Sequence, residues 1–499
     1  MGKDNFFKNS FLLTASNITT GIIGFIFSIY LSKVIGPEGM GLYNLVMPIY
    51  NLFICVMTAG VAASISQISA VYTSKNENNN LVRTIKVVTI FNFVWALFIA
   101  VLVFICAPII GEYGIKDIRT IDAIRVTCPA MIFIALSNIL KGYFWGTSKI
   151  TSPAIIDIFE KALRILTVAI LIYIFNAKSL SALVTLCYVA LALGELQSLL
   201  LLFVYYKRSV KSLPKTYERP ERRSQLLFNV LIVSFPLTLN GFLSNIFNTL
   251  STLVVPRCLV ASGFEHSEAL SMIGKFTGMA MMIIGIPLIV VSSINTLLIP
   301  DLSQTMTSGN YYDASVRIRK VLKISFILGL ATTVITSIIP NSLGEMFYQR
   351  SDLGQYIKIA GLCAPIFFVS LPMNSILNGL NKQGIILRNS LIISSFELIL
   401  LFCLTSIPNI NIFSYAITLF LSSILSFTIN FLEIKKYLDL SLSKVNILIF
   451  SLLGILIFLA YKLLLSHIYI GSHVFKVLFV IISIFAIFAY LSTFGLEEE

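Results

Sequence analysis

Long apolar runs separated by short polar segments extend over almost the whole chain. Fourteen of them approach or exceed the ~20 residues that an α-helix needs to cross a bilayer. They cover residues 9–32, 41–72, 84–109, 122–146, 153–175, 180–206, 229–255, 269–298, 319–339, 354–380, 385–406, 411–434, 445–465 and 473–494. The second and eighth runs are longer than one crossing requires, so we expect them to tilt or break. The pattern predicts an all-α integral membrane protein with about 14 transmembrane helices, and the even number places both termini on one side.

Composition agrees with a surface that faces lipid. The 499 residues are 57% hydrophobic and only 12% charged, whereas a soluble domain carries about 25% charged residues. The first apolar run continues to about Leu31 without a clear small-residue cleavage site. A signal-peptide core is shorter, so we expect this run to be a retained first helix.

The chain lacks the short motifs of nucleotide-binding and hydrolytic enzymes, namely GxxxxGK[ST], GxSxG and HExxH. Its seven Cys form no CxxC pair and its three His are scattered, so we expect no metal and no other cofactor. Without a nucleotide-binding domain, an ion gradient, the membrane potential or downhill movement of cargo must supply the energy. We therefore expect no enzyme; a membrane enzyme built from scattered polar residues is the alternative.

Basic residues are distributed unevenly between the two sets of loops. The N-terminus and the loops after even-numbered helices hold 23 Lys and Arg, and the other loops hold 11. The richer side is expected to be cytoplasmic, which puts both termini and the 207–228 segment there. This segment is the best candidate for a linker, because it holds seven basic residues together with Pro214 and Pro220. The net charge of +13 thus indicates that the basic residues contact anionic lipid headgroups rather than nucleic acid.

The two halves of the chain resemble each other when shifted by 237 residues. Ile139-Leu140-Lys141-Gly142 then aligns with Ile376-Leu377-Asn378-Gly379, and Phe159-Glu160 aligns with Phe396-Glu397. Repeated lobes with a substrate site between them are a common transporter plan. We expect an N-terminal six-helix lobe over 1–206, a second over 229–437, and two additional helices within 438–499.

Polar residues recur at helical spacing within four of the apolar runs. The candidates for lining a cavity are Asn17, Ser28, Asn51, Asn245 and Asn248. Polar side chains in a bilayer face protein or water rather than lipid. Tight helix packing explains any single one of them, and a water-filled cavity explains the set.

Ionisable residues inside apolar runs are functional candidates by default. Glu160, Lys161 and Arg164 lie in the fifth run and Glu195 in the sixth. Glu160–Arg164 and Lys161–Glu195 pairs would neutralise all four, and the alternative is a role in ion coupling. Glu397 has no cation at matching depth in the next helix. A lone buried carboxyl tends to be protonated near neutral pH, so Glu397 is either a proton-coupling site or a neutral hydrogen-bonding group.

Three cations lie near the outer ends of helices one, seven and eight. Lys33, Arg257 and Lys275 together have the charge needed to hold a diphosphate. The alternative is that they extend to the membrane surface without touching cargo.

Several short motifs occur in order along nearly the whole chain. They are Gly36-Pro37-Glu38-Gly39-Met40-Gly41-Leu42-Tyr43, Leu253-Val254-Val255-Pro256-Arg257-Cys258-Leu259 with Ala261-Ser262-Gly263-Phe264, Thr277-Gly278-Met279-Ala280 with Pro287, and Ile407-Pro408-Asn409-Ile410-Asn411-Ile412. Together they resemble the stage V sporulation protein B family, within the multidrug/oligosaccharidyl-lipid/polysaccharide exporter superfamily.

The resemblance implies two lobes round a central cavity that opens alternately to either side. It implies a flippase that moves an undecaprenyl-diphosphate-linked saccharide, such as lipid II or a spore-cortex precursor, across the bacterial cytoplasmic membrane. A cation-coupled multidrug exporter and a non-transporting sporulation scaffold are the alternatives. Expected partners are the cargo and membrane lipids, without nucleic acid; the oligomeric state is open.

The sequence departs from the families that it resembles at three positions. Lipid II flippases carry an Arg-Asp pair where this chain has Phe27 and Ser28, and the sporulation family tends to have Gln near Lys275. A diphosphate-binding cation has therefore moved, or the cargo differs.

Overall fold

Helices joined by short turns and loops make up the residues that the computed structural model describes, 3–58, 60–214, 221–307, 309–440, 443–467 and 473–493. Within this part, ten helices are long and apolar enough to cross a membrane, or eleven if the bent pair α12–α13 counts as one. The predicted all-α membrane fold is confirmed. By contacts, the chain forms two compact units. Unit 1 is Met1–Tyr30 with Leu42–Leu253, and unit 2 is Leu31–Gly41 with Val254–Glu499.

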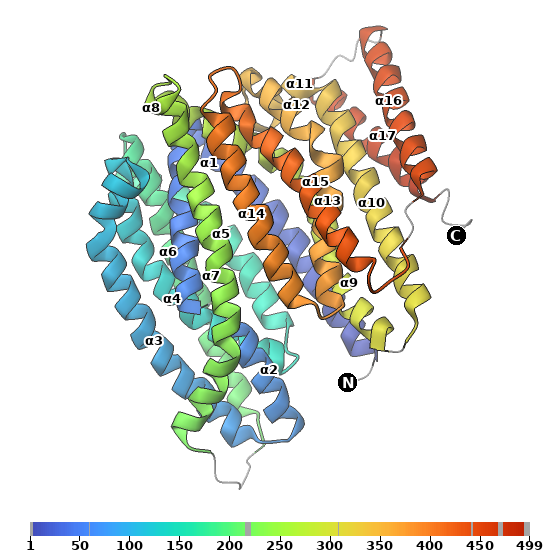
Figure 1. Cartoon of the computed structure of the whole chain (residues 1–499). Helices are drawn as coiled ribbons and strands as arrows, with labels where there is room; N and C mark the ends of the chain where they lie inside the picture. The colour runs from blue at the N-terminus through green and yellow to red at the C-terminus, as the bar shows by residue number, and fades with distance from the viewer. Residues whose placement is uncertain are drawn as a thin grey trace. The chain divides into compact units, whose positions relative to one another are not determined.

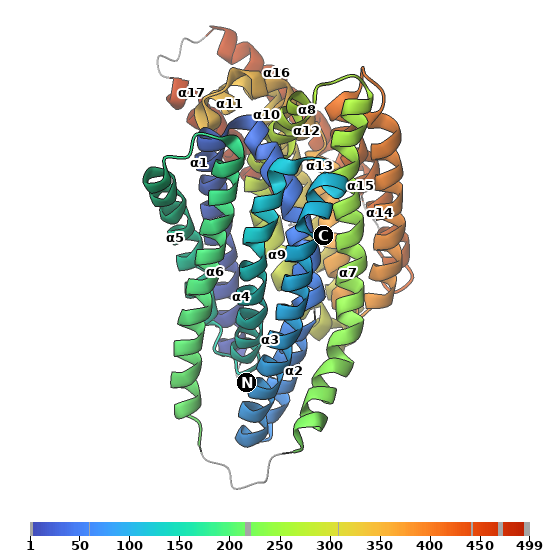
Figure 2. The ribbon, with the colours of Figure 1, turned by 90° about the vertical axis from the view of Figure 1, so that its left-hand side faces the viewer.

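Unit 1 is a bundle in which α4 packs against α2, α3 and α6 (Figures 1 and 2). Its helices are α1 (Lys3–Thr58, except 31–41), α2 (Val61–Ser74), α3 (Asn78–Ile109), α4 (Ile121–Gly146), α5 (Thr151–Phe175), α6 (Leu180–Lys211) and α7 (Arg223–Ala261) as far as Leu253, with short turns η1 (Ile110–Ile115) and η2 (Ile118–Thr120). Close approach of α4 to α2 depends on small residues. A Cβ at Gly142 would lie 2.6 Å from the Ala62 carbonyl oxygen, and one at Gly146 would lie 2.3 Å from that of Ser66.

Unit 2 is built round α10 and α13, which pack against each other and against α9. It contains α8 (His266–Ile273), η3 (Gly274–Ala280), α9 (Met281–Thr307), α10 (Tyr311–Ile338), α11 (Pro340–Tyr348), η4 (Ser351–Leu353), α12 (Gly354–Leu362), α13 (Ala364–Gly379), α14 (Gln383–Thr405), η5 (Asn411–Phe413), α15 (Ser414–Ile434), α16 (Lys444–His467) and α17 (His473–Thr493). The last two helices contact α10 (Figure 1).

The long apolar runs break or distort where the backbone leaves regular α-helix. The second run is interrupted at Gly60, the N-cap of α2, whose φ of 78° is left-handed. The eighth contains the π-helical turn η3. The tenth bends by 51° between α12 and α13. Each change divides a predicted span without removing its apolar character.

The predicted lobes and the compact units describe different properties. The lobes 1–206 and 229–437 rest on internal similarity and stay a prediction, while the units follow contacts and divide inside α1 and α7. In the 207–228 segment, α6 continues to Lys211 and α7 begins at Arg223. Lys215 and Arg219 lie outside the described residues.

Within unit 2, the segment 31–41 of α1 packs on α8 and η3 with almost no space between the backbones. Gly36 (φ 65°) bends α1 within the segment, a conformation that glycine adopts without steric cost. A Cβ at Gly41 would lie 2.1 Å from the Leu270 carbonyl oxygen, and one at Gly274 would lie 1.9 Å from that of Pro37. Only glycine allows this contact.

Gly274→Ala tests the contact. The added methyl meets backbone, which cannot rotate away, so we expect a loss of about 1–3 kcal/mol or more. Thermal unfolding of the purified protein in detergent measures it. Gly285→Ala in α9 is the matched control, because a Cβ there has nothing within 4 Å. Equal unfolding temperatures for the two variants would contradict the predicted clash.

Candidate functional site

Exposed amide side chains on α1 and α7 form the polar part of the candidate site in unit 1. Asn17, Asn51 and Asn248 are exposed although the helices carrying them are apolar. Asn245 donates to the Gly241 carbonyl 2.9 Å away and lies against the Cys55 thiol. Exposed amides do not face hydrocarbon, so these helix faces require water or protein.

The two helices are also joined directly. The Thr249 hydroxyl of α7 donates to the Pro48 carbonyl of α1 over 3.2 Å. Ser28 is buried, so of the five polar candidates it is the one whose side chain is placed for packing rather than for ligand contact.

The three candidate cations all belong to unit 2 but differ in their surroundings. Lys33 and Arg257 are exposed. Lys275, in η3, is 20% exposed, and its Nζ lies 2.8 Å from Oδ2 of Asp352 and 5.9 Å from the centre of the Tyr356 ring. Asp352 also accepts from Arg350 at 2.8 Å. The carboxylate of Asp352 therefore already compensates part of the positive charge near Lys275.

A buried ion cluster joins α5 to α6 in unit 1. Glu160, Arg164 and Glu195 are less than 9% exposed. Arg164 Nε donates to Glu160 Oε1 at 2.9 Å, and its Nη2 lies 3.3 Å from Oε1 of Glu195. A Cβ at Gly194 of α6 would lie 2.7 Å from Oε1 of Glu160. The glycine therefore leaves space on α6 for the carboxylate that α5 carries.

The predicted Lys161–Glu195 pair is wrong. Lys161 pairs with Glu160 at 3.1 Å, and its side chain is 38% exposed. It follows Glu160 by one position, which turns it about 100° round the helix, whereas Arg164 at i+4 lies on the face of Glu160. The predicted Glu160–Arg164 pair is present.

Glu397 lies half-buried in α14. Among the described residues its side chain makes no ion pair or hydrogen bond, and it lies near the half-buried Tyr415 of α15. Its role, as a proton-coupling site or as a neutral hydrogen-bonding group, stays a prediction.

Sequence reasoning missed a polar network between α13, α14 and α15. Asn389 donates to Asn430 at 2.8 Å, and Asn430 donates to Asn374 at 3.3 Å. Arg388 and Lys436 both pair with Glu433. Both central amides are fully buried. Two asparagines in successive apolar runs were a signal for it, since each needs a partner in the membrane.

The sequence and the fold of the chain are similar to those of several known proteins. The profile of the polysaccharide biosynthesis protein family matches residues 6–306, and the MatE profile matches 236–403. Stage V sporulation protein B of Bacillus subtilis (strain 168) is 25% identical over 89% of this chain and 86% of its own. Lipid II flippase MurJ of the same organism is 22% identical over 75% of this chain and 73% of its own. The solved structure of lipid II flippase MurJ in an inward closed conformation superposes with a TM-score of 0.73, at 13% identity, covering 96% of this chain and 98% of its own.

Arg164→Leu tests what the buried cluster contributes. It leaves Glu195 buried without its cation, and breaking a buried pair costs about 3–5 kcal/mol. We expect a matching loss in unfolding free energy and in membrane abundance. Lys161→Gln is the control, since a partly exposed pair is worth about 0–1 kcal/mol. If both variants are equally stable, the cluster does not hold α5 on α6.

Proposed function

Because the chain belongs to the polysaccharide biosynthesis protein family, a family of membrane transporters and not of enzymes, we propose that it moves a lipid-linked saccharide from the inner to the outer leaflet. The proposed cargo is an undecaprenyl-diphosphate-linked peptidoglycan precursor such as lipid II. The name of one relative, lipid II flippase MurJ, supports this class of cargo. The name of another, stage V sporulation protein B, supports a role in sporulation. The apolar spans and the bacterial relatives support a place in the bacterial cytoplasmic membrane.

The observation that carries the proposal is the chemistry of the exposed polar groups. Asn17, Asn51 and Asn248 are amides, which both donate and accept hydrogen bonds as sugar hydroxyls require. The cations Lys33, Arg257 and Lys275 suit a diphosphate, whose charge needs compensation away from bulk water. Taken separately, the amides of unit 1 suit a saccharide and the cations of unit 2 suit a diphosphate, and neither set suits a cationic drug.

A cation-coupled multidrug exporter is the second candidate, favoured by the MatE match. Such a protein needs a carboxylate in the path of its cationic cargo. The sequence of α7 contains no Asp or Glu, and α1 contains only Asp4 and Glu38. The composition of these two helices therefore favours the saccharide.

The remaining parts of the proposal concern orientation and energy. The loop charges favour cytoplasmic termini and a cytoplasmic 207–228 segment. An ion gradient or the membrane potential would drive the cycle. Glu397 and the cluster of Glu160, Lys161, Arg164 and Glu195 are the candidates for coupling.

Flipping of fluorescent lipid II in proteoliposomes tests the function, with Lys275→Gln as the informative variant. If Lys275 contacts the diphosphate, the variant loses a charge-assisted contact worth about 1.5–3 kcal/mol. We expect cargo affinity to fall roughly ten- to hundredfold. Dithionite quenching measures flipping, and titration of the cargo measures affinity.

Asp352→Asn separates a cargo contact from a structural one. It removes the same ion pair but keeps the charge of Lys275, so a cargo role predicts unchanged or stronger binding, and a structural role predicts the same defect as Lys275→Gln. Lys358→Gln, an exposed cation of α12, controls for net charge. No flipping of any lipid-linked saccharide by the wild type would refute the function and favour the scaffold or the exporter.

Glu397→Gln tests coupling. Gln keeps the shape and hydrogen-bonding capacity of a protonated carboxyl but cannot exchange a proton. If Glu397 couples proton movement to transport, flipping driven by a pH gradient should be lost at normal protein abundance. Transport with the wild-type dependence on pH would assign Glu397 a purely structural role.

A further inference from the structure

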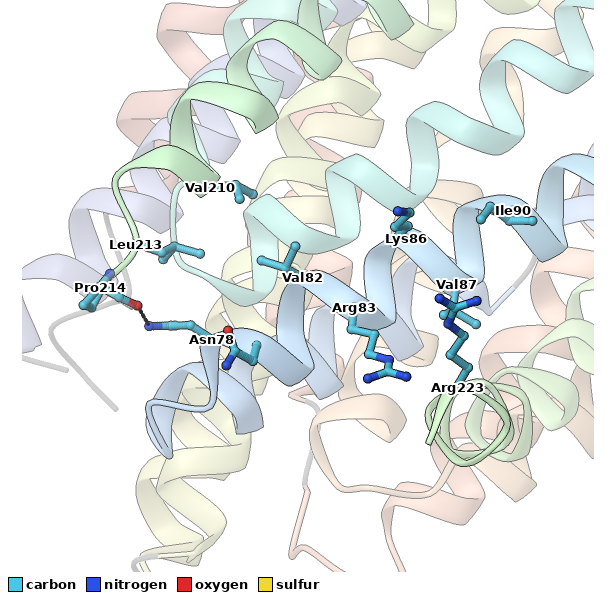
Figure 3. Close-up of a pocket in the computed structure, with 11 residues that line it drawn as sticks. Asn78, Val82, Arg83, Lys86, Val87, Ile90, Val210, Leu213, Pro214 and Arg223 are labelled. Carbon is cyan, nitrogen blue, oxygen red and sulfur yellow. Dashed lines mark hydrogen bonds between the residues drawn. The ribbon is translucent and has the colours of Figure 1, made fainter. Parts of the chain in front are cut away.

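Unit 1 has a basic hollow, formed by the first turns of α3, the end of α6 and the start of α7. Its volume is about 940 Å³, and its charged lining residues are Arg83, Lys86 and Arg223. Figure 3 shows the side chains of Arg83 and Arg223 extending into the same space beside Val87. No Asp or Glu lines the hollow.

These cations have no acidic partner in the part of the chain that the structure describes. None of its ion pairs involves Arg83, Lys86 or Arg223. Three positive side chains round one space repel each other unless an anion joins them. Two guanidinium groups with an ammonium are the donors that proteins use for phosphate.

An apolar groove of about 860 Å³ lies beside the hollow, along α3, α4 and α6. Val82, Lys86, Ile90 and Val210 line both spaces, so the two lie side by side along α3. The groove is otherwise lined mainly by leucine, isoleucine and aromatic side chains, with Lys207 and Lys211 at the end of α6. It therefore combines a charged end with an apolar length, as a phospholipid does.

We propose that the basic hollow and the apolar groove together bind one anionic phospholipid. Its phosphate lies among Arg83, Lys86 and Arg223, and an acyl chain lies along the groove. The charged end is the one that the loop charges predict to be cytoplasmic, where anionic headgroups attract basic residues. The ligand is thus a lipid of the inner leaflet, such as phosphatidylglycerol.

The lining favours a phospholipid over a lipid-linked saccharide. A sugar needs many hydrogen-bonding partners, but the uncharged polar side chains here are Asn78 and Asn79 in the hollow and Thr89 in the groove, besides the hydroxyl of Tyr206. Asn78 already donates to the Pro214 carbonyl at 2.9 Å (Figure 3). None of the candidate cargo residues lines either space.

The full-length protein, in nanodiscs of phosphatidylcholine with increasing phosphatidylglycerol, tests the proposal. Native mass spectrometry counts retained lipid, and thermal unfolding follows its binding. We expect one phosphatidylglycerol to be retained preferentially. Each basic residue near anionic lipid contributes about fivefold in affinity, so Arg83→Gln, Lys86→Gln and Arg223→Gln together should weaken binding on the order of a hundredfold.

Two further variants separate a built site from general charge attraction. Lys75→Gln, Lys116→Gln and Lys178→Gln together remove the same charge from exposed positions outside the hollow and should leave binding unchanged. Ile90→Trp keeps every cation but fills the start of the groove. Because Ile90 is 58% exposed, the fold tolerates the larger ring, and we expect at least tenfold weaker lipid binding.

Equal retention of phosphatidylglycerol by wild type and the Arg83, Lys86 and Arg223 variant would overturn the proposal. So would normal binding by Ile90→Trp, which would mean attraction of headgroups only, or displacement of phosphatidylglycerol by undecaprenyl diphosphate, which would make the groove a cargo site. None of these results depends on flipping activity, so this proposal and the proposed function fail independently.

Discussion

In hydrocarbon no water is available to hydrogen-bond a backbone amide or carbonyl, so the chain must satisfy these groups internally. This requirement determines most of the secondary structure. It explains why the described residues form only helices and turns. A similar cost applies to polar side chains. Most of the candidate side chains are either paired, as in the Glu160–Arg164–Glu195 cluster, or exposed, as the amides of α1 and α7 are; Glu397 is an exception. The first arrangement holds helices together. Exposed amides are stable in a membrane only where water or a polar ligand reaches the helix. The proposed function rests on this difference.

The same requirement made the helices predictable from sequence. The ion-pair partners of their charged side chains could not be predicted in the same way. A run of ~20 apolar residues is defined by bilayer thickness, so length alone located most spans. The cation facing Glu195 was assigned by depth along the α5–α6 hairpin. Depth in the membrane does not say on which face of the helix a side chain lies. Lys161 and Arg164 lie at similar depth but on different faces of α5. Asp352 could not be predicted as the partner of Lys275, because it lies in a turn 77 positions later and only the fold brings the two together.

The candidate residues divide between the two units by chemistry. The amides of α1 and α7 belong to unit 1, and Lys33, Arg257 and Lys275 belong to unit 2. Both α1 and α7 contribute to both units, so the helices that carry most of the polar candidates also connect the units covalently. The start of α7 lines the basic hollow, and its last turns carry Arg257. A lipid held at one end of α7 would therefore bind to an element that also carries a candidate cargo residue.

The contact of Gly41 with Leu270 and of Pro37 with Gly274 has a consequence for synthesis of the protein in the cell. The first half of each contact leaves the ribosome more than two hundred residues before the second. At ~5–20 residues per second, this separation is a delay of about 10–50 s. During that time the bent segment round Gly36 lacks the surface on which it finally packs. Unit 2 therefore cannot complete its packing before α8 and η3 have been synthesised, although its first segment is made close to the start of the chain.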